Sequence, residues 1–166
     1  GTLFIFTLVD NEEGFNKAVN ERIEAKKQEM NQLGYNDGKN DVLSTPQDIE
    51  EIYVKAYQEG YEKAQKELEE EYNNQGYEAA FTMLKYKEPS FPNPKFKEWY
   101  KEGFNSNKVI EKIEKAGYVL GESGEDYKLP TKYEKGEEIF KHYYDLGKVE
   151  YEAKKRTVQT SVATGA

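Results

Sequence analysis

The chain has 166 residues, with 32 Asp and Glu against 24 Lys and Arg, which gives a formal net charge of −8. Hydrophobic residues make up only 36% and mean hydropathy is −1.01, yet 14% of the residues are aromatic and 14 are Tyr. Because disordered chains are poor in aromatic residues, this composition predicts one folded, thin, largely helical domain with a Tyr-rich core. It disfavours a compact catalytic domain with a deep apolar core.

The missing residue types exclude several kinds of site. The chain has no Cys, which excludes disulfide frameworks, thiolate nucleophiles and Cys-ligated metal sites. Its acidic balance argues against a surface that binds phosphates broadly. No run within residues 1–166 approaches the roughly 18–20 apolar residues of a membrane span, and none has the pattern of a signal peptide. Both a cytoplasmic and a secreted location stay open.

The first ten residues form a separate apolar N-terminal segment, 1–10. Residues 3–9 are apolar apart from Thr7, and their β-branched and aromatic content favours a buried strand or a first helical turn. The alternative is that they are the end of a longer apolar segment. Gly1 in place of Met fits a processed product or a module of a longer polypeptide.

Helical spacing of apolar residues dominates the rest, and residues 11–156 are interpreted as one helical domain. Four helical stretches are predicted: 12–33, 46–87, 96–116 and 134–156. A kink or break is expected at 69–74 in the second stretch, and the Pro-rich segment 88–94 ends it. The third is expected to be interrupted at 105–107, where Asn105 or Ser106 can cap a new helix.

Two segments depart from the helical pattern. Residues 118–120 and 127–129 flank polar turn residues at 122–125, which predicts a short β-hairpin near 118–129. Residues 157–166 are small and polar, which predicts a disordered tail. The expected fold is therefore mainly α, with elongated or bundled helices and one small β-hairpin.

Glycine and aromatic residues recur side by side along the chain, for example in Gly60-Tyr61 and Gly103-Phe104. The copies are irregularly spaced, so we do not expect a solenoid of fixed period. A glycine inside a helix costs about 1 kcal/mol relative to Ala. Such glycines therefore need a compensating contact.

A small-residue strip on the second predicted helix could supply that contact. Small residues and tyrosines form two neighbouring strips there: Ala56, Gly60 and Ala64, and beside them Tyr53, Tyr57 and Tyr61. The simpler interpretation is intramolecular helix packing, in which Tyr rings cover a neighbouring helix while their hydroxyls stay hydrated. The functional interpretation is an interaction face that receives a partner helix or a second copy. This face would also include Tyr143, Tyr144 and Gly147 on the last helix.

The sequence contains no motif for catalysis or for binding a cofactor or metal. His142 is the only His, and Glu138 one turn earlier could orient it, but no Ser stands in a nucleophile context. The acidic segments 36–41 and 121–126 do not place ligands as a calcium loop does, and no phosphate-binding glycine-rich loop occurs. We therefore expect no enzymatic activity, no cofactor and no metal site.

One arrangement favours nucleic-acid binding as an alternative. Helices at 96–103 and 107–116 followed by a hairpin have the order of a winged helix-turn-helix, and residues 85–115 are rich in Lys. Against this alternative, the candidate recognition helix is short, Glu111 and Glu114 lie on it, and the region has no Arg.

The leading hypothesis is a non-enzymatic helical protein–protein interaction module, compatible with a bacterial source, that binds a protein partner or self-associates. The first alternative is a winged-helix-like nucleic-acid binder at 96–129. The second is a segment of a larger secreted bacterial effector or toxin.

Overall fold

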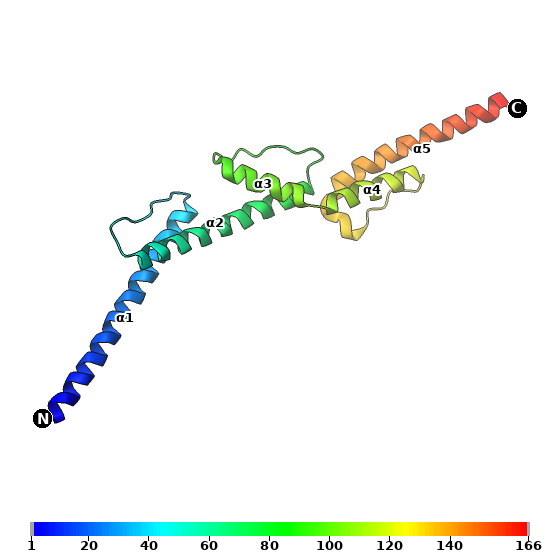
Figure 1. The fold of residues 1–166 in the computed structure, drawn as a ribbon. Coiled ribbons are helices and arrows are strands. Elements are labelled where there is room, and N and C mark those ends of the chain that lie inside the picture. The colour runs from blue at the N-terminus through cyan, green and yellow to red at the C-terminus, as the bar shows by residue number, and fades with distance from the viewer. Residues whose placement is uncertain (1, 166) are drawn as a thin grey trace. The chain divides into compact units, whose positions relative to one another are not determined.

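A computed structural model describes the backbone of residues 2–165 and the side chains of residues 12–160 and 162. Five α helices and one 3₁₀ helix follow one another (Figure 1): α1 (Thr2–Lys39), α2 (Glu51–Ala80), α3 (Pro94–Ser106), α4 (Val109–Glu122), η1 (Thr131–Gly136) and α5 (Glu137–Gly165). The prediction of a mainly α fold is confirmed. Within residues 2–165, no helix combines the length and the apolar character that crossing a membrane requires.

The chain divides into two compact units, residues 1–69 and residues 70–166. The first unit holds α1 and the first part of α2, and the second holds the rest of α2 and all later helices. α2 is one continuous helix over its whole length, so the kink or break expected at 69–74 does not interrupt it.

The junction between α3 and α4 lies at 106–109, close to the predicted interruption at 105–107. The side chain of Asn107, which is 6% exposed, accepts a hydrogen bond from the Val109 N–H at 3.0 Å. The same side chain donates to the carbonyl of Tyr77 at 2.9 Å. One buried amide therefore satisfies the start of α4 and joins it to α2 within the second unit.

The prediction of a β-hairpin near 118–129 is wrong, because residues 2–165 contain no strand. α4 continues through residue 122 instead. Gly117 and Gly121 are one helical turn apart and both lie against the backbone of α5, an arrangement that requires the helical conformation. Gly124, with φ of +76°, follows the helix in a conformation that favours glycine.

The first and last described segments are helical. Residues 2–10 belong to α1, so their backbone is helical and not a strand, while their side chains lie outside the described residues. α5 continues to Gly165, whereas we predict a disordered tail over 157–166. Helical contacts persist into that segment, since the Thr157 hydroxyl donates to the carbonyl of Ala153 at 3.0 Å. Residue 166 lies outside the described residues.

In the first unit, α1 and α2 pack in parallel. The Asn31 side chain donates to the carbonyl of Ala56 at 3.1 Å, and the Gln65 side chain donates to the carbonyl of Gly38 at 2.8 Å. Residue numbers therefore rise together along the two helices. The connecting segment 40–50 runs back to the start of the pair before α2 begins (Figure 1).

The second unit contains two more parallel pairs. Asn73 and Tyr77 of α2 contact Gly103 of α3 and Asn107 directly after it, again in rising order. In the same way, residues 117 and 121 of α4 lie against residues 140 and 144 of α5. The apolar core of this unit lies around the α4–α5 pair and consists of Phe81, Ile113, Ile139 and Phe140.

A proline at Val119 tests whether this segment is helical. The Val119 side chain is 57% exposed, so its own packing contributes little. Val119→Pro removes a backbone donor from the helix interior and should lower the free energy of unfolding by about 3 kcal/mol. The control Val119→Ala keeps the donor and should stay within about 0.5 kcal/mol of the parent. Equal stability of the two variants in urea unfolding would contradict a helix at this position.

Candidate functional site

The residues predicted to form an interaction face on α2 are covered by α1 within the first unit. Five of the six are buried: Tyr53, Ala56, Tyr57, Gly60 and Ala64. The sixth, Tyr61, is half-buried, with its ring stacked on that of Tyr57 at a centroid distance of 6.4 Å. These strips serve intramolecular helix packing, the simpler of the two interpretations, and are not open to a partner in this structure.

Two glycines make reciprocal backbone contacts between α1 and α2. A Cβ at Gly34 would overlap the carbonyl oxygen of Tyr57, and a Cβ at Gly60 would overlap the carbonyl oxygen of Asn31. Asn31 stands three positions before Gly34, and Tyr57 three positions before Gly60. Each glycine therefore faces the carbonyl of the residue three positions before the partner glycine. We call a glycine together with the residue three positions before it a glycine-contact motif.

Both helix pairs of the second unit repeat this contact. Each glycine again lies against the carbonyl oxygen of the first residue of the partner motif. The paired motifs are Asn73/Gly76 with Tyr100/Gly103, between α2 and α3, and Tyr118/Gly121 with Tyr144/Gly147, between α4 and α5. All three described helix pairs therefore share one interface geometry.

The repeat is nearly regular when only the reciprocally contacting glycines are counted, contrary to the expectation of irregular spacing. The two glycines of a pair stand 26, 27 and 26 positions apart in the three pairs. The first glycines of successive pairs, Gly34, Gly76 and Gly121, are 42 and 45 positions apart. The second glycines are 43 and 44 positions apart. The structure thus identifies a repeated helix-pair unit that other glycine–aromatic neighbours in the sequence obscure.

Close backbone approach explains why glycine occupies these positions. Without a Cβ, the Cα–H can reach a carbonyl oxygen of the neighbouring helix, a contact worth about 0.5–1 kcal/mol. This offsets much of the about 1 kcal/mol that glycine costs in a helix. Tyr burial beside each contact adds apolar stabilisation. The first residue of the second motif in each pair is a buried Tyr: Tyr57 is 0%, Tyr100 7% and Tyr144 5% exposed.

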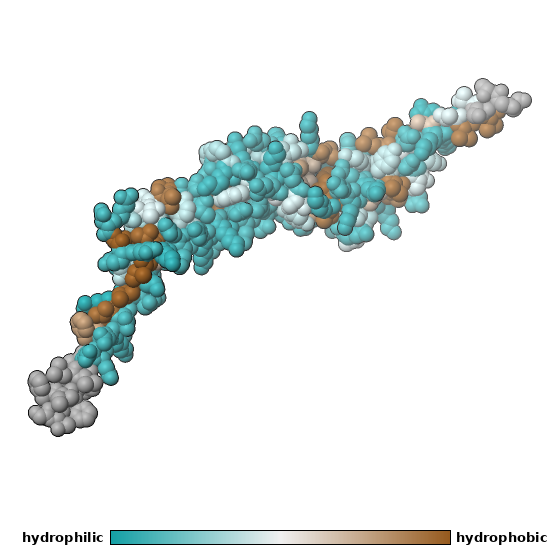
Figure 2. Space-filling model, in the orientation of Figure 1, coloured by the Kyte–Doolittle hydropathy of each residue, from teal (hydrophilic) through white to brown (hydrophobic). Residues whose placement is uncertain are grey.

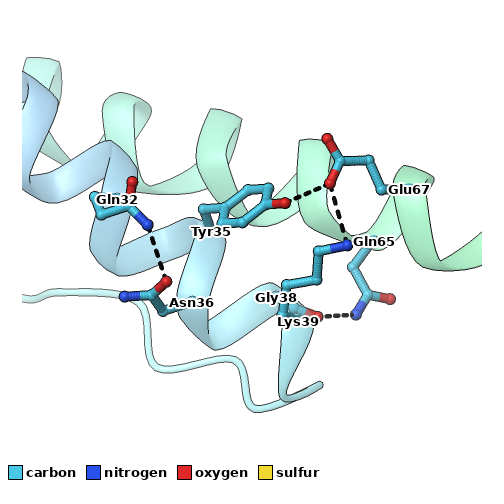
Figure 3. Close-up of polar contacts among 7 residues, drawn as sticks. All are labelled: Gln32, Tyr35, Asn36, Gly38, Lys39, Gln65 and Glu67. Carbon is cyan, nitrogen blue, oxygen red and sulfur yellow. Dashed lines mark hydrogen bonds and ion pairs between the residues drawn. The ribbon is translucent and has the colours of Figure 1, made fainter.

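Polar side chains close the α1–α2 pair at its C-terminal end (Figure 3). The Tyr35 hydroxyl donates to Glu67 at 2.5 Å, and the Lys39 ammonium lies 3.1 Å from the same carboxylate oxygen. These two donors hold the pKa of the Glu67 carboxyl below its ordinary value. The hydrogen bond to Glu67 and burial raise the pKa of Tyr35. The carboxylate of Glu67 thus joins α2 to two successive turns of α1.

The buried Tyr57 hydroxyl joins both helices to the connecting segment. It donates to the carboxylate of Asp37 at 2.5 Å and accepts from the Ser44 N–H at 2.9 Å. Burial, followed by the hydrogen bond to Asp37, raises the pKa of Tyr57. The Tyr57 hydroxyl therefore makes both of these hydrogen bonds within the first unit.

The predicted face on the last helix is likewise part of the α4–α5 packing. Tyr144 is buried and its hydroxyl donates to the carbonyl of Glu125 at 2.8 Å. Gly147 lies against the carbonyl of Tyr118. Tyr143 is half-buried, and a hydrogen bond to Glu114 together with burial raises its pKa. None of the nine predicted face residues lies on an uncovered helix face.

No catalytic arrangement is visible around His142. Its side chain is exposed, and its ring lies edge-on to that of Tyr143 with centroids 5.3 Å apart. Within the part of the chain that the structure describes, no cluster of three His, Asp or Glu side chains could hold a metal ion. This is the environment of an ordinary surface histidine.

Gly14 of α1 has a sequence context like that of Gly60, but no helix covers it. Residues 11–18 read Asn-Glu-Glu-Gly-Phe-Asn-Lys-Ala and residues 57–64 read Tyr-Gln-Glu-Gly-Tyr-Glu-Lys-Ala, identical at four positions and aromatic at a fifth. Gly14 thus corresponds to Gly60, but a Cβ there would meet no atom within 4 Å. Phe15 is 68% exposed, whereas the corresponding Tyr61 is half-buried. Sequence reasoning missed this site, although the similarity of the two octapeptides could have revealed it.

The surface around Gly14 is apolar along one line of the helix. Phe15, Val19 and Ile23 are four positions apart and therefore lie along one side of α1. Figure 2 shows apolar side chains as a stripe along this part of α1. We call Gly14, Phe15, Ala18 and Val19 the Gly14 face.

Alanine substitutions at Gly60 and Gly14 test the packing role of glycine. Gly60→Ala should lower the free energy of unfolding by about 1–3 kcal/mol because the Cβ overlaps the α1 backbone. The matched variant Gly14→Ala has room for its Cβ, so helicity should be equal or higher, with no loss of stability. Urea unfolding and far-ultraviolet circular dichroism measure both effects. Similar effects of the two substitutions would contradict the backbone contact at Gly60.

The Glu67 contacts predict a pH dependence of stability. A carboxyl with a lowered folded-state pKa stabilises the fold above its unfolded pKa of about 4.3, and this contribution is lost as pH falls through the folded pKa. Wild type should therefore be more stable than Glu67→Gln at pH 7, and the difference should shrink towards pH 3. Glu62→Gln, an exposed carboxyl on the same helix, is the control. A difference that is independent of pH would rule out this role of Glu67.

Comparison with protein-family models, with curated proteins and with solved structures finds no match to this chain.

Proposed function

We propose that this chain is a non-enzymatic helical protein–protein interaction module that binds a partner helix on the Gly14 face of α1. The observation that carries the proposal is the uncovered glycine within a segment that resembles 57–64. In the three described helix pairs, the contacting glycines lie against the backbone of a parallel neighbour. At Gly14 the same residue pattern is present without the neighbour.

The position of Gly14 on α1 supports an independent docking face. Gly14 stands 20 positions before Gly34, which contacts α2. At about 100° per residue, the two glycines point in directions about 200° apart, on nearly opposite sides of the helix. Gly14 itself therefore points away from the side that α2 covers, and a second helix can approach it without displacing α2.

The apolar character of the face supports a helix as the ligand. A partner helix carrying its own glycine-contact motif would bring its backbone against Gly14 and cover Phe15, as α1 covers Gly60 and part of Tyr61 in the first unit. Covering a large exposed aromatic ring contributes favourable burial at about 25 cal/mol per Å² of apolar surface.

The winged-helix alternative loses its main structural support. That alternative needs the predicted hairpin near 118–129 as its wing. In the structure, these residues instead continue α4 to Glu122 and then form an irregular segment. α4 also packs along its glycine face against α5.

A labelled peptide tests the proposal directly. The probe is a synthetic peptide of residues 109–124, which contains the motif Tyr118/Gly121, titrated with the full chain in fluorescence anisotropy. We expect saturable binding to the wild type and loss of binding to Gly14→Leu, whose side chain blocks the backbone approach. Asn16→Leu is the matched control, because it adds the same side chain about 200° away around the helix. Binding that is equal in Gly14→Leu and wild type would contradict the proposal.

A further inference from the structure

We infer that the helix bound by the Gly14 face is the C-terminal part of α5 from a second copy of this chain, packed in parallel around Gly165. This inference rests on the proposed function, because it names the partner of that face. It follows from the order in which glycine-contact motifs alternate along the sequence.

Gly165 stands where the repeat places the next motif. In the second unit, Gly121 follows Gly103 by 18 positions, and Gly165 follows Gly147 by the same 18 positions. The helix α5 extends to Gly165, so the glycine is helical, as its counterparts are. The residue three positions earlier is Val162, which makes Val162/Gly165 the candidate motif.

The described surface next to Gly165 is uncovered. Val162 is 66% exposed, whereas the corresponding residues of the three paired motifs, Asn31, Asn73 and Tyr118, are half-buried. Val158, one helical turn before Val162, is 62% exposed. Two exposed apolar residues on one side of α5 thus precede the glycine, as expected of a first helix that lacks its second.

The chain therefore offers both halves of a fourth helix pair. Gly14 belongs to a second-helix sequence that no helix covers in this structure, and Gly165 occupies a first-helix position next to the exposed Val162. In the docked pair, Gly165 of one copy would face the carbonyl of Asn11 in the next, and Gly14 of that copy would face the carbonyl of Val162. The contact joins two different surfaces, so it is heterologous and can continue through successive copies or close into a ring.

Two single substitutions and their mixture test this arrangement. Gly14→Leu blocks one surface and leaves α5 intact, and Gly165→Leu blocks the other and leaves α1 intact. Sedimentation velocity over a concentration series up to about 1 mM, equivalent to about −4 kcal/mol of binding free energy, measures the assembly. Asn16→Leu is again the control, and circular dichroism checks that all variants keep their helices.

We expect wild type and Asn16→Leu to assemble beyond dimers with rising concentration, and each glycine variant alone to stay monomeric. An equimolar mixture of Gly14→Leu and Gly165→Leu should form a one-to-one dimer and stop there, because only one compatible junction remains. A monomeric wild type, glycine variants that assemble as wild type does, or a mixture without dimers would each overturn the inference.

The peptide titration separates this inference from the proposed function. If wild type stays monomeric while peptide 109–124 still binds in a manner that Gly14→Leu abolishes, a second copy is not the partner and the helix-binding function stands. If Gly14→Leu leaves peptide binding unchanged, the proposed function fails and the assembly inference fails with it.

Discussion

The close approach of a glycine Cα to a carbonyl oxygen of a parallel neighbouring helix is the contact on which the rest of the structure depends. One reciprocal pair of such contacts occurs in each described helix pair, and a Cβ at any of these six glycines would overlap the opposite backbone. Helices this close leave little room for aliphatic side chains between them. Burial comes instead from Tyr rings beside the contact, whose hydroxyls reach polar partners, as in Tyr57 with Asp37. A chain built this way can be polar and rich in Tyr at once.

Because the helices of each pair are parallel, the connecting segment must return to the start of the pair before the next helix begins. Each such segment contacts the buried Tyr of the second motif. The three contacts are Ser44 N–H with the Tyr57 hydroxyl at 2.9 Å, and Phe91 with Tyr100 and Tyr127 with Tyr144 at ring centroid distances of 5.6 and 5.2 Å. The Tyr of the motif therefore fixes both the neighbouring helix and the return path. The repeated element is thus a helix, its return segment and the next helix.

Local patterns predicted the helices but not their direction or partners. The sequence predicted the interruption near Asn107 and the small-residue strip around Gly60, because capping and helical spacing act over a few residues. The prediction of a hairpin at 118–129 was wrong because the polar residues 122–125 were interpreted as a turn between two strands. The helix up to residue 122 instead depends on the contacts of Gly117 and Gly121 with α5, more than 20 positions away. The regular repeat was hidden for the same reason, since only contacts reveal which glycines count. The uncovered Gly14 could have been found by aligning 11–18 with 57–64.

Distances within the first unit test the parallel pairing most directly. Because the chain has no Cys, nitroxide labels can be attached to the double variant Asn40→Cys with Lys66→Cys and to Asn40→Cys with Glu51→Cys. The parallel pair places residue 40 beside the later part of α2, since Gly38 accepts from Gln65. Double electron–electron resonance should therefore give a short distance between the labels at 40 and 66. The distance between the labels at 40 and 51 should be longer by about 20 Å, because α2 rises about 1.5 Å per residue between 51 and 66. A short 40–51 distance with a long 40–66 distance would mean an antiparallel hairpin and would contradict the reciprocal glycine contacts.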